Sequence, residues 1–230
     1  MTAPFTISEY GTATKGVIFI FGGWRTSKAM YLLGIREFNK LGWRCVLFLP
    51  HPKLIAVNSP YQDIVDAGEI ANQYVAHYIA ESPQDTVFMA MGISFGTLFA
   101  ADVTKRHQRI TKMVLSAPFG DFSKHVGLWN DHWYFGRVLR SQPTDMQASA
   151  AVLNRLAIAN NIERLAEKQI LVLYGNRDKI THTTAVHSII TDLKAANADT
   201  IVHASPGGHF RAIFGNSRWI RKNHREFFVL

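Results

Sequence analysis

Cysteine is nearly absent from this chain of 230 residues, in which Cys45 stands alone. A single cysteine cannot form a disulfide within the chain, so the sequence is not that of a disulfide-stapled scaffold. No stretch reaches the roughly 18 consecutive apolar residues that a membrane-spanning helix needs. The first residues also lack the basic start and apolar core of a secretory signal. These absences lead us to expect a cytoplasmic protein without a membrane span.

Motifs for nucleotides, metals and nucleic acids are missing as well. The chain contains neither a G-x-G-x-x-G fingerprint nor a G-x-x-x-x-G-K-[ST] loop. His182 and His187 are five positions apart, no acidic residue completes a helical pair of ligands, and His51 stands between two prolines. No nucleic-acid-binding motif is present either. We therefore predict no metal, no cofactor and no nucleic-acid partner.

Acidic residues are fewer than basic ones, 17 against 25, and the formal net charge is +8. A basic surface favours anionic partners. Four of the basic residues would share one face of a C-terminal helix, namely Arg218, Arg221, Lys222 and Arg225. This face is either solvated, or it binds an anionic substrate or an acidic acyl carrier protein.

Short apolar runs alternate with longer helical patterns along most of the chain. Strands are predicted at residues 15–21, 43–49, 86–91, 110–116, 169–174 and 200–204, with residues 5–10 as a further edge strand. Helices are predicted at residues 27–40, 61–80, 95–107, 146–159, 183–195 and 210–228. This alternation indicates a mostly parallel sheet with helices on both faces. We predict an α/β fold, a three-layer α/β/α sandwich with about six to eight strands.

The alternation stops between residues 121 and 168, where no clear strand is found. Because this segment lies between two predicted core strands, we interpret it as a short helical lid inserted into a single domain of residues 1–230. Its aromatic residues are candidates for an apolar acyl pocket: Trp129, Trp133, Tyr134 and Phe135. The same residues would also serve simply to pack the lid onto the core.

The motif Gly92-Ile93-Ser94-Phe95-Gly96 follows one predicted strand and opens the next helix. A sharp strand-to-helix turn exposes the serine hydroxyl at the edge of the sheet, and glycines leave room for so tight a turn. A serine is a weak nucleophile until a base removes its proton. The motif therefore predicts Ser94 as a nucleophile that needs a partner base.

Partners for Ser94 are found in loops that follow later strands. His209 comes directly after the predicted strand 200–204, where open α/β sheets place their ligands. Asp178 follows the strand 169–174 and would hold the imidazole of His209 in the correct tautomer. Asp121, which follows the strand 110–116, is the alternative acid.

Hydrolysis through an acyl-enzyme also needs two backbone N–H donors for the oxyanion. Phe95, the residue after the nucleophile, is the candidate for the first donor. The loop Phe21-Gly22-Gly23-Trp24 follows the first core strand and supplies the second. Trp24 is favoured for this second amide, and Gly23 is the alternative.

With these features the chain resembles the α/β-hydrolase superfamily over nearly its whole length. The order Ser94, Asp178, His209 is that of the family. The resemblance implies an eight-stranded sheet with one antiparallel strand. It also implies carboxylic ester hydrolysis through an acyl-enzyme, with a small-molecule acyl ester as substrate. The alternatives are an acyl thioesterase and a non-catalytic ligand-binding protein with the same fold. The family often has a histidine before the oxyanion glycine, where this chain has Phe21.

Overall fold

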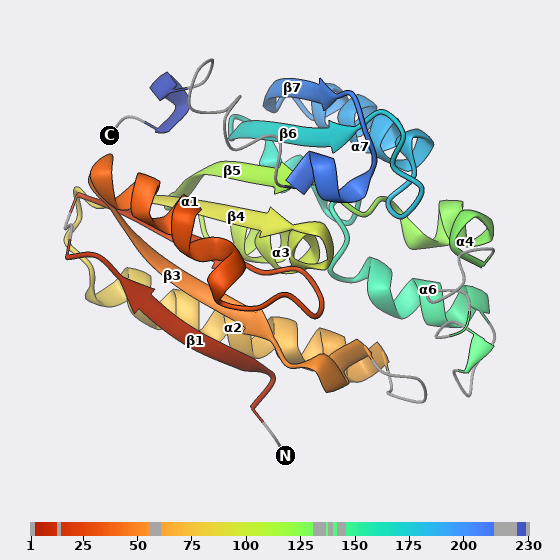
Figure 1. The fold of residues 1–230 in the computed structure, drawn as a ribbon, viewed down its shortest axis with the longest axis horizontal. Coiled ribbons are helices and arrows are strands. Elements are labelled where there is room, and N and C mark those ends of the chain that lie inside the picture. Colours follow the sequence, from red (N-terminus) through yellow and green to blue (C-terminus); the bar gives the residue numbers. More distant parts are fainter. Residues whose placement is uncertain are drawn as a thin grey trace.

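The computed structural model describes residues 3–12, 15–55, 61–130, 137, 140–141, 146–213 and 225–228. Its centre is a seven-stranded sheet with the order β1-β3-β2-β4-β5-β6-β7 (Figure 1). The strands are β1 (Phe5–Tyr10), β2 (Gly16–Phe21), β3 (Trp43–Pro50), β4 (Val87–Ile93), β5 (Ile110–Ser116), β6 (Gln169–Gly175) and β7 (Asp199–Ser205). β1 runs antiparallel to β3, and all other neighbouring strands are parallel. The predicted strands, including the edge strand, are thereby confirmed.

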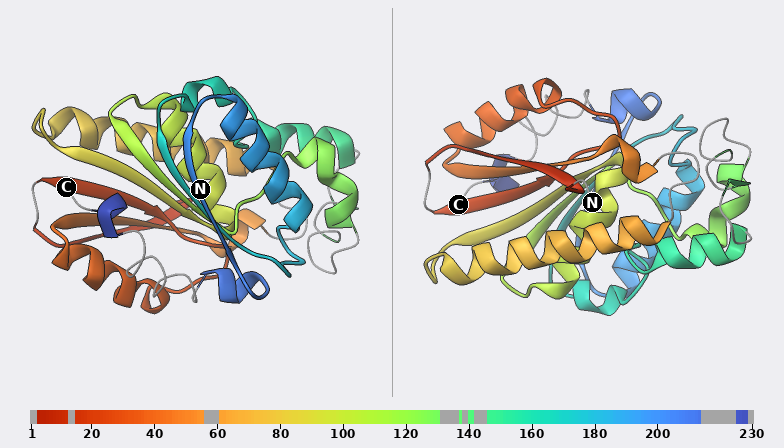
Figure 2. Two further views of the ribbon diagram at one scale, coloured as in Figure 1. Left: turned by 90° about the horizontal axis from the view of Figure 1, so that it is seen from above. Right: turned by 90° about the horizontal axis from the view of Figure 1, so that it is seen from below.

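Helices cover both faces of this sheet, as Figure 2 shows from above and below. They are α1 (Ala29–Lys40), α2 (Tyr61–Glu81), α3 (Thr97–Arg106), α4 (Phe122–Asn130), α6 (Met146–Asn154) and α7 (Thr183–Ala195). In β2, Val17, Phe19 and Phe21 face the core formed with α2 and α3, whereas Ile18 and Ile20 face the core formed with α1. A strand buried on both faces needs apolar side chains at every position, which explains the unbroken apolar run of β2.

The predicted lid segment contains two helices at the carboxyl ends of the strands, α4 and α6 (Figure 1). α6 buries Ala150 and Leu153 in the same core as α2. The sequence pattern did not reveal α4 as a separate helix. Of the predicted pocket residues, Trp133, Tyr134 and Phe135 lie outside the described residues. Trp129 lies in α4, but its side chain is likewise outside the description.

The C-terminal part of the chain is described only in pieces. Residues 209–213 are helical, as predicted, and the 3₁₀ helix η4 (Arg225–Phe228) packs Phe227 and Phe228 on the α1 side of the sheet. Arg218, Arg221 and Lys222 of the predicted basic face lie outside the described residues. Among the helices that are described, none combines the length and the apolarity needed to cross a bilayer.

Candidate active site

Ser94 lies in a strained turn between the end of β4 and the start of α3. The turn is a short 3₁₀ helix, η2 (Ser94–Gly96), and Ser94 has a φ of 53° in the left-handed region. A Cβ atom at Gly92 would collide with the Cα of Thr97, and one at Gly96 would collide with the carbonyl oxygen of Phe21. Neither position 92 nor position 96 has room for a side chain, so both must be glycine. A non-glycine residue at positive φ costs free energy that the surrounding packing must offset, and such residues cluster at functional sites.

The structure brings Ser94, His209 and Asp178 into one chain of hydrogen bonds. His209 Nε2 lies 2.9 Å from the Oγ of Ser94, and His209 Nδ1 lies 2.8 Å from the Oδ2 of Asp178. The three residues follow β4, β7 and β6, whose carboxyl ends meet at the same edge of the sheet because these strands run in the same direction. His209 is 8% exposed and Asp178 is 4% exposed. The arrangement can move a proton from the serine to the imidazole in a site largely shielded from water.

Hydrogen-bond donors contact both oxygens of Asp178 and favour its ionised carboxylate form. Its Oδ1 accepts hydrogen bonds from the amides of Ile180 at 2.8 Å and Thr181 at 3.1 Å, and its Oδ2 accepts one from the hydroxyl of Thr181 at 2.8 Å. Burial alone would raise the pKa of this carboxyl. The hydrogen bond and charge of His209, together with the Thr181 and Ile180 donors, outweigh burial, so the pKa of Asp178 lies below its ordinary value.

Asp121, the alternative acid, is engaged elsewhere. Its Oδ1 accepts hydrogen bonds from the amide of Lys124 at 3.0 Å and from the side-chain amide of Asn154 at 2.9 Å. The first contact satisfies a free amide at the start of α4, and the second joins α4 to α6. Asp121 thus ties the two helices of the predicted lid together, while His209 bonds to Asp178.

The loop after β2 passes directly beside the nucleophile. A Cβ atom built on Gly23 would lie 3.5 Å from the Cβ of Ser94 and 3.3 Å from the carbonyl oxygen of Ile93. Trp24, the next residue, is half-buried and packs against the core. On the other side of Ser94, the side chain of Phe95 is buried in edge-to-face contact with Phe99. Gly23 therefore lies beside Ser94 in space, Phe95 follows Ser94 in the turn, and Trp24 follows Gly23 in the adjacent loop.

A closed ring of hydrogen bonds fixes this loop. The amide of Gly23 donates to the hydroxyl of Tyr31 at 2.8 Å, the Tyr31 hydroxyl donates to the Oγ1 of Thr26 at 2.7 Å, and Thr26 donates back to the carbonyl of Gly23 at 2.6 Å. The ring thus already engages the amide of Gly23, which donates to the hydroxyl of Tyr31. Tyr31 and Thr26 carry no sequence signal that would have revealed this task.

The described residues contain no group of three or more histidine, cysteine, aspartate or glutamate side chains arranged to hold a metal ion. Of the two histidines considered as ligands, His187 has its Nε2 3.0 Å from the hydroxyl of Tyr174. His182 precedes α7 and has a φ of 50°. The hydrogen bond of His187 involves none of Ser94, Asp178 and His209.

Comparison with known proteins gives a result at the level of the fold. No protein-family model and no curated protein matches the sequence. Solved structures do match over nearly the whole chain. A carboxyl esterase from Bacillus coagulans has a TM-score of 0.65 at 14% identity, covering 98% of this chain and 92% of the esterase. A monoacylglycerol lipase from Paleococcus ferrophilus has a TM-score of 0.65 at 15% identity, covering 98% of both chains.

A third match is an alpha/beta hydrolase enzyme from the metagenome of lagoon sediments at Mar Chica, Morocco. Its TM-score is 0.63 at 16% identity, and the alignment covers 97% of this chain and 94% of that one. Identities this low carry information on the fold and not on the activity. Together with the sheet topology, these matches show that the protein has the α/β-hydrolase fold.

Proposed function

We propose that the protein is a serine hydrolase that cleaves a carboxylic ester, with Ser94 as nucleophile, His209 as base and Asp178 as the acid that orients His209. The observation that carries this proposal is the hydrogen-bond chain from Ser94 through His209 to Asp178, with lengths of 2.9 and 2.8 Å. An ester is proposed as the substrate class, and the names of two structural neighbours, a carboxyl esterase and a monoacylglycerol lipase, are consistent with it.

The reaction follows from this geometry in two halves. Ser94 Oγ attacks the acyl carbonyl as His209 Nε2 takes its proton, and Asp178 stabilises the imidazolium that forms. The amides of Phe95 and Trp24 stabilise the oxyanion, and His209 then protonates the leaving alcohol. Water, activated by His209, attacks the acyl-enzyme and releases the carboxylic acid. No cofactor takes part in this proposal.

The segment 121–168 serves in this proposal as a lid over the acyl part of the substrate. Support comes from α4 and α6, which lie at the carboxyl ends of the strands (Figure 1), and from Ser94, which directly follows the carboxyl end of β4. A thioester, including one carried by an acidic acyl carrier protein, is the main alternative substrate. A panel of esters and thioesters of graded acyl length distinguishes the two and identifies the preferred acyl chain.

Replacing the nucleophile tests the proposal. We expect Ser94→Ala to abolish turnover of p-nitrophenyl butyrate and labelling by a fluorophosphonate probe. Ser82→Ala is the matched control, since Ser82 directly follows α2 and its hydroxyl donates to the carbonyl of Tyr78. Equal turnover in wild type and Ser94→Ala would refute the proposal. If the wild type neither turns over esters or thioesters nor labels, the non-catalytic ligand-binding alternative is favoured instead.

A further inference from the structure

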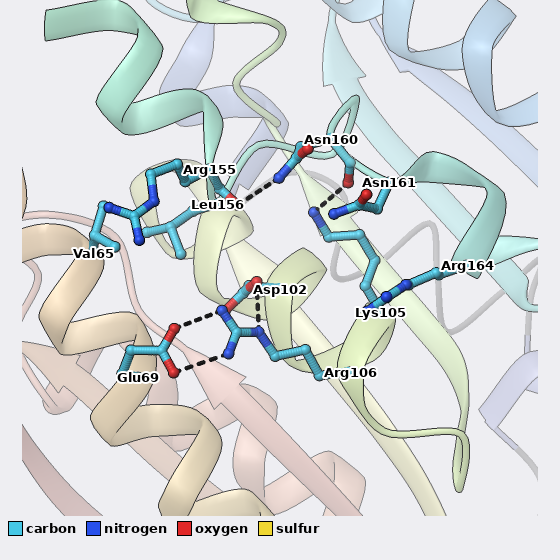
Figure 3. Close-up of a pocket in the computed structure, with 10 residues that line it drawn as sticks. All are labelled: Val65, Glu69, Asp102, Lys105, Arg106, Arg155, Leu156, Asn160, Asn161 and Arg164. Carbon is cyan, nitrogen blue, oxygen red and sulfur yellow. Dashed lines mark hydrogen bonds and ion pairs between the residues drawn. The ribbon is translucent and has the colours of Figure 1, made fainter.

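A pocket lies at the opposite end of α3 from Ser94. It has a volume of about 290 Å³ and is lined by residues of α2, α3 and the segment that leads from α6 toward β6 (Figure 3). Lys105, in the last turn of α3, contributes to its wall, and it lies about 12 Å along the helix axis from Thr97 at 1.5 Å per residue, whereas the turn of Ser94 precedes Thr97. The pocket is therefore distinct from the proposed active site.

Positive charge dominates the side chains that line this pocket. The lining contains four cations, Lys105, Arg106, Arg155 and Arg164, against two carboxylates, Glu69 and Asp102. Arg106 pairs with both carboxylates. Its guanidinium contacts Glu69 at 2.6 and 2.9 Å and Asp102 at 3.2 Å, as the dashed lines in Figure 3 mark. Both negative charges are thus taken by one arginine.

The other three cations have no such partner. Within the described part of the chain, no carboxylate lies within ion-pair distance of Lys105, Arg155 or Arg164. Arg155 makes one long hydrogen bond, 3.3 Å, to the side chain of Gln62. Figure 3 shows the Arg155 side chain extending toward Val65, and the Arg164 side chain reaching toward Lys105 from the other side. Lys105, Arg155 and Arg164 therefore line one cavity without an ion pair of their own among the described residues, although Asp102 and Glu163 attract Lys105.

Lys105 is the buried member of this group, with an exposed fraction of 8%. Its Nζ donates to the backbone carbonyls of Ala157 at 2.7 Å and Asn160 at 2.8 Å. An ammonium carries three hydrogens, so one donor is left over. Burial is the main cause that lowers the pKa of Lys105 to about 8; attraction by Asp102 and Glu163 opposes it, and repulsion from Arg106 and Arg164 adds to it. An anion in the pocket would complete the hydrogen bonds of Lys105 and relieve this repulsion.

We infer that this pocket binds a phosphate group, held by Lys105 and Arg164 with Arg155 at the rim. Three cations suit a doubly charged phosphate better than a carboxylate, and guanidinium groups match phosphate oxygens in geometry. The volume corresponds to roughly ten waters, more than a phosphate ion fills. The shared chemistry is a phosphate group, and its source is either inorganic phosphate or the monoester of a small polar molecule.

Isothermal titration calorimetry tests this inference on the full chain. Inorganic phosphate and glycerol 3-phosphate are titrated separately at about pH 7, with ionic strength held constant by sodium chloride so that screening does not change. We expect saturable binding of one equivalent. Tighter binding of glycerol 3-phosphate identifies a phosphorylated small molecule as the ligand, and equal or weaker binding identifies inorganic phosphate.

Variants locate the binding. We expect Lys105→Met to weaken it about tenfold and Arg164→Gln about threefold, because a buried charged donor contributes more than an exposed one. Lys168→Met is the matched control, since Lys168 Nζ also donates to two carbonyls, those of Gln108 and Ile110, but lies outside the pocket. Arg36→Gln is the control for an exposed arginine.

Three binding results would overturn the inference. Absence of saturable phosphate binding by the wild type refutes it. Binding that persists unchanged in Arg164→Gln and Lys105→Met, or falls equally in Lys168→Met, also refutes it. If Lys105→Met does not fold, Arg164→Gln decides alone, because the exposed Arg164 makes no hydrogen bond to a described residue that its loss would break.

Discussion

Replacing Asp178 with asparagine exchanges one carboxylate oxygen for an NH₂ group. This substitution therefore tests the hydrogen-bond geometry around His209. Oδ1 of Asp178 accepts from two backbone amides, those of Ile180 and Thr181, which are able only to donate. The asparagine carbonyl must therefore keep this position, and its NH₂ group must take the place of Oδ2 beside His209. Since NH₂ donates, His209 Nδ1 must accept, and the ring proton moves to Nε2. Such an imidazole cannot take the proton of Ser94, which lies 2.9 Å away.

The size of the expected loss in kcat follows from placing the ring proton of His209 on the wrong nitrogen. In serine hydrolases with this triad, the exchange lowers kcat by about 10⁴, equivalent to about 5.5 kcal/mol of activation free energy. We expect a loss of this size in p-nitrophenyl butyrate turnover, whereas KM stays within about threefold, because the exchange leaves the substrate-binding groups in place. Stopped-flow kinetics on purified variants, with thermal unfolding recorded in parallel, separates the catalytic loss from a loss of folded protein.

Asp121→Asn is the control for this experiment. Asp121 is the other aspartate in a loop after a core strand, and an asparagine oxygen is able to accept from Lys124 and Asn154 in the same way. We expect its kcat to stay within about twofold of wild type, since a hydrogen bond of this kind contributes only about 1 kcal/mol to stability. If Asp178→Asn retains more than about a tenth of wild-type kcat while Ser94→Ala is inactive, the tautomer argument is refuted.

Three further changes probe the site and its support. Tyr31→Phe leaves the Gly23 amide without its acceptor, so we expect kcat to fall about tenfold with little change in KM; unchanged steady-state kinetics would contradict the role of the hydrogen-bond ring. Gly96→Ala drives a Cβ atom against the carbonyl of Phe21, so we expect a loss of about 3 kcal/mol in urea unfolding, and an unchanged midpoint would show that the turn relaxes. The folded-state pKa of Asp178 lies below the ordinary 3.8, so its stabilising contribution is present above about pH 4 and is lost as pH falls through the folded pKa. The destabilisation by Asp178→Asn should therefore shrink between about pH 5 and pH 2, and an equal effect at both ends would be inconsistent with the lowered pKa.

The sequence by itself determined the elements of the sheet. A strand buried on both faces, such as β2, must be a continuous apolar run, and this local pattern can be read from the sequence alone. The sequence also indicated the turn at Ser94, because a collision-free backbone there demands glycine at positions 92 and 96. The placement of Asp178 and His209 after later strands followed from topology, since the carboxyl ends of parallel strands share one edge.

Only the tertiary structure decided how side chains from different segments meet. Which aspartate bonds to His209, and which amide beside Ser94 is already engaged, depend on distances between loops that no local pattern encodes. The same holds for α4, whose link to α6 runs through Asp121 and Asn154. The cationic pocket is the clearest case: its charges come from α3 and from a segment about fifty residues later, and only the packing of α3 against that segment brings Lys105 and Arg164 to one cavity.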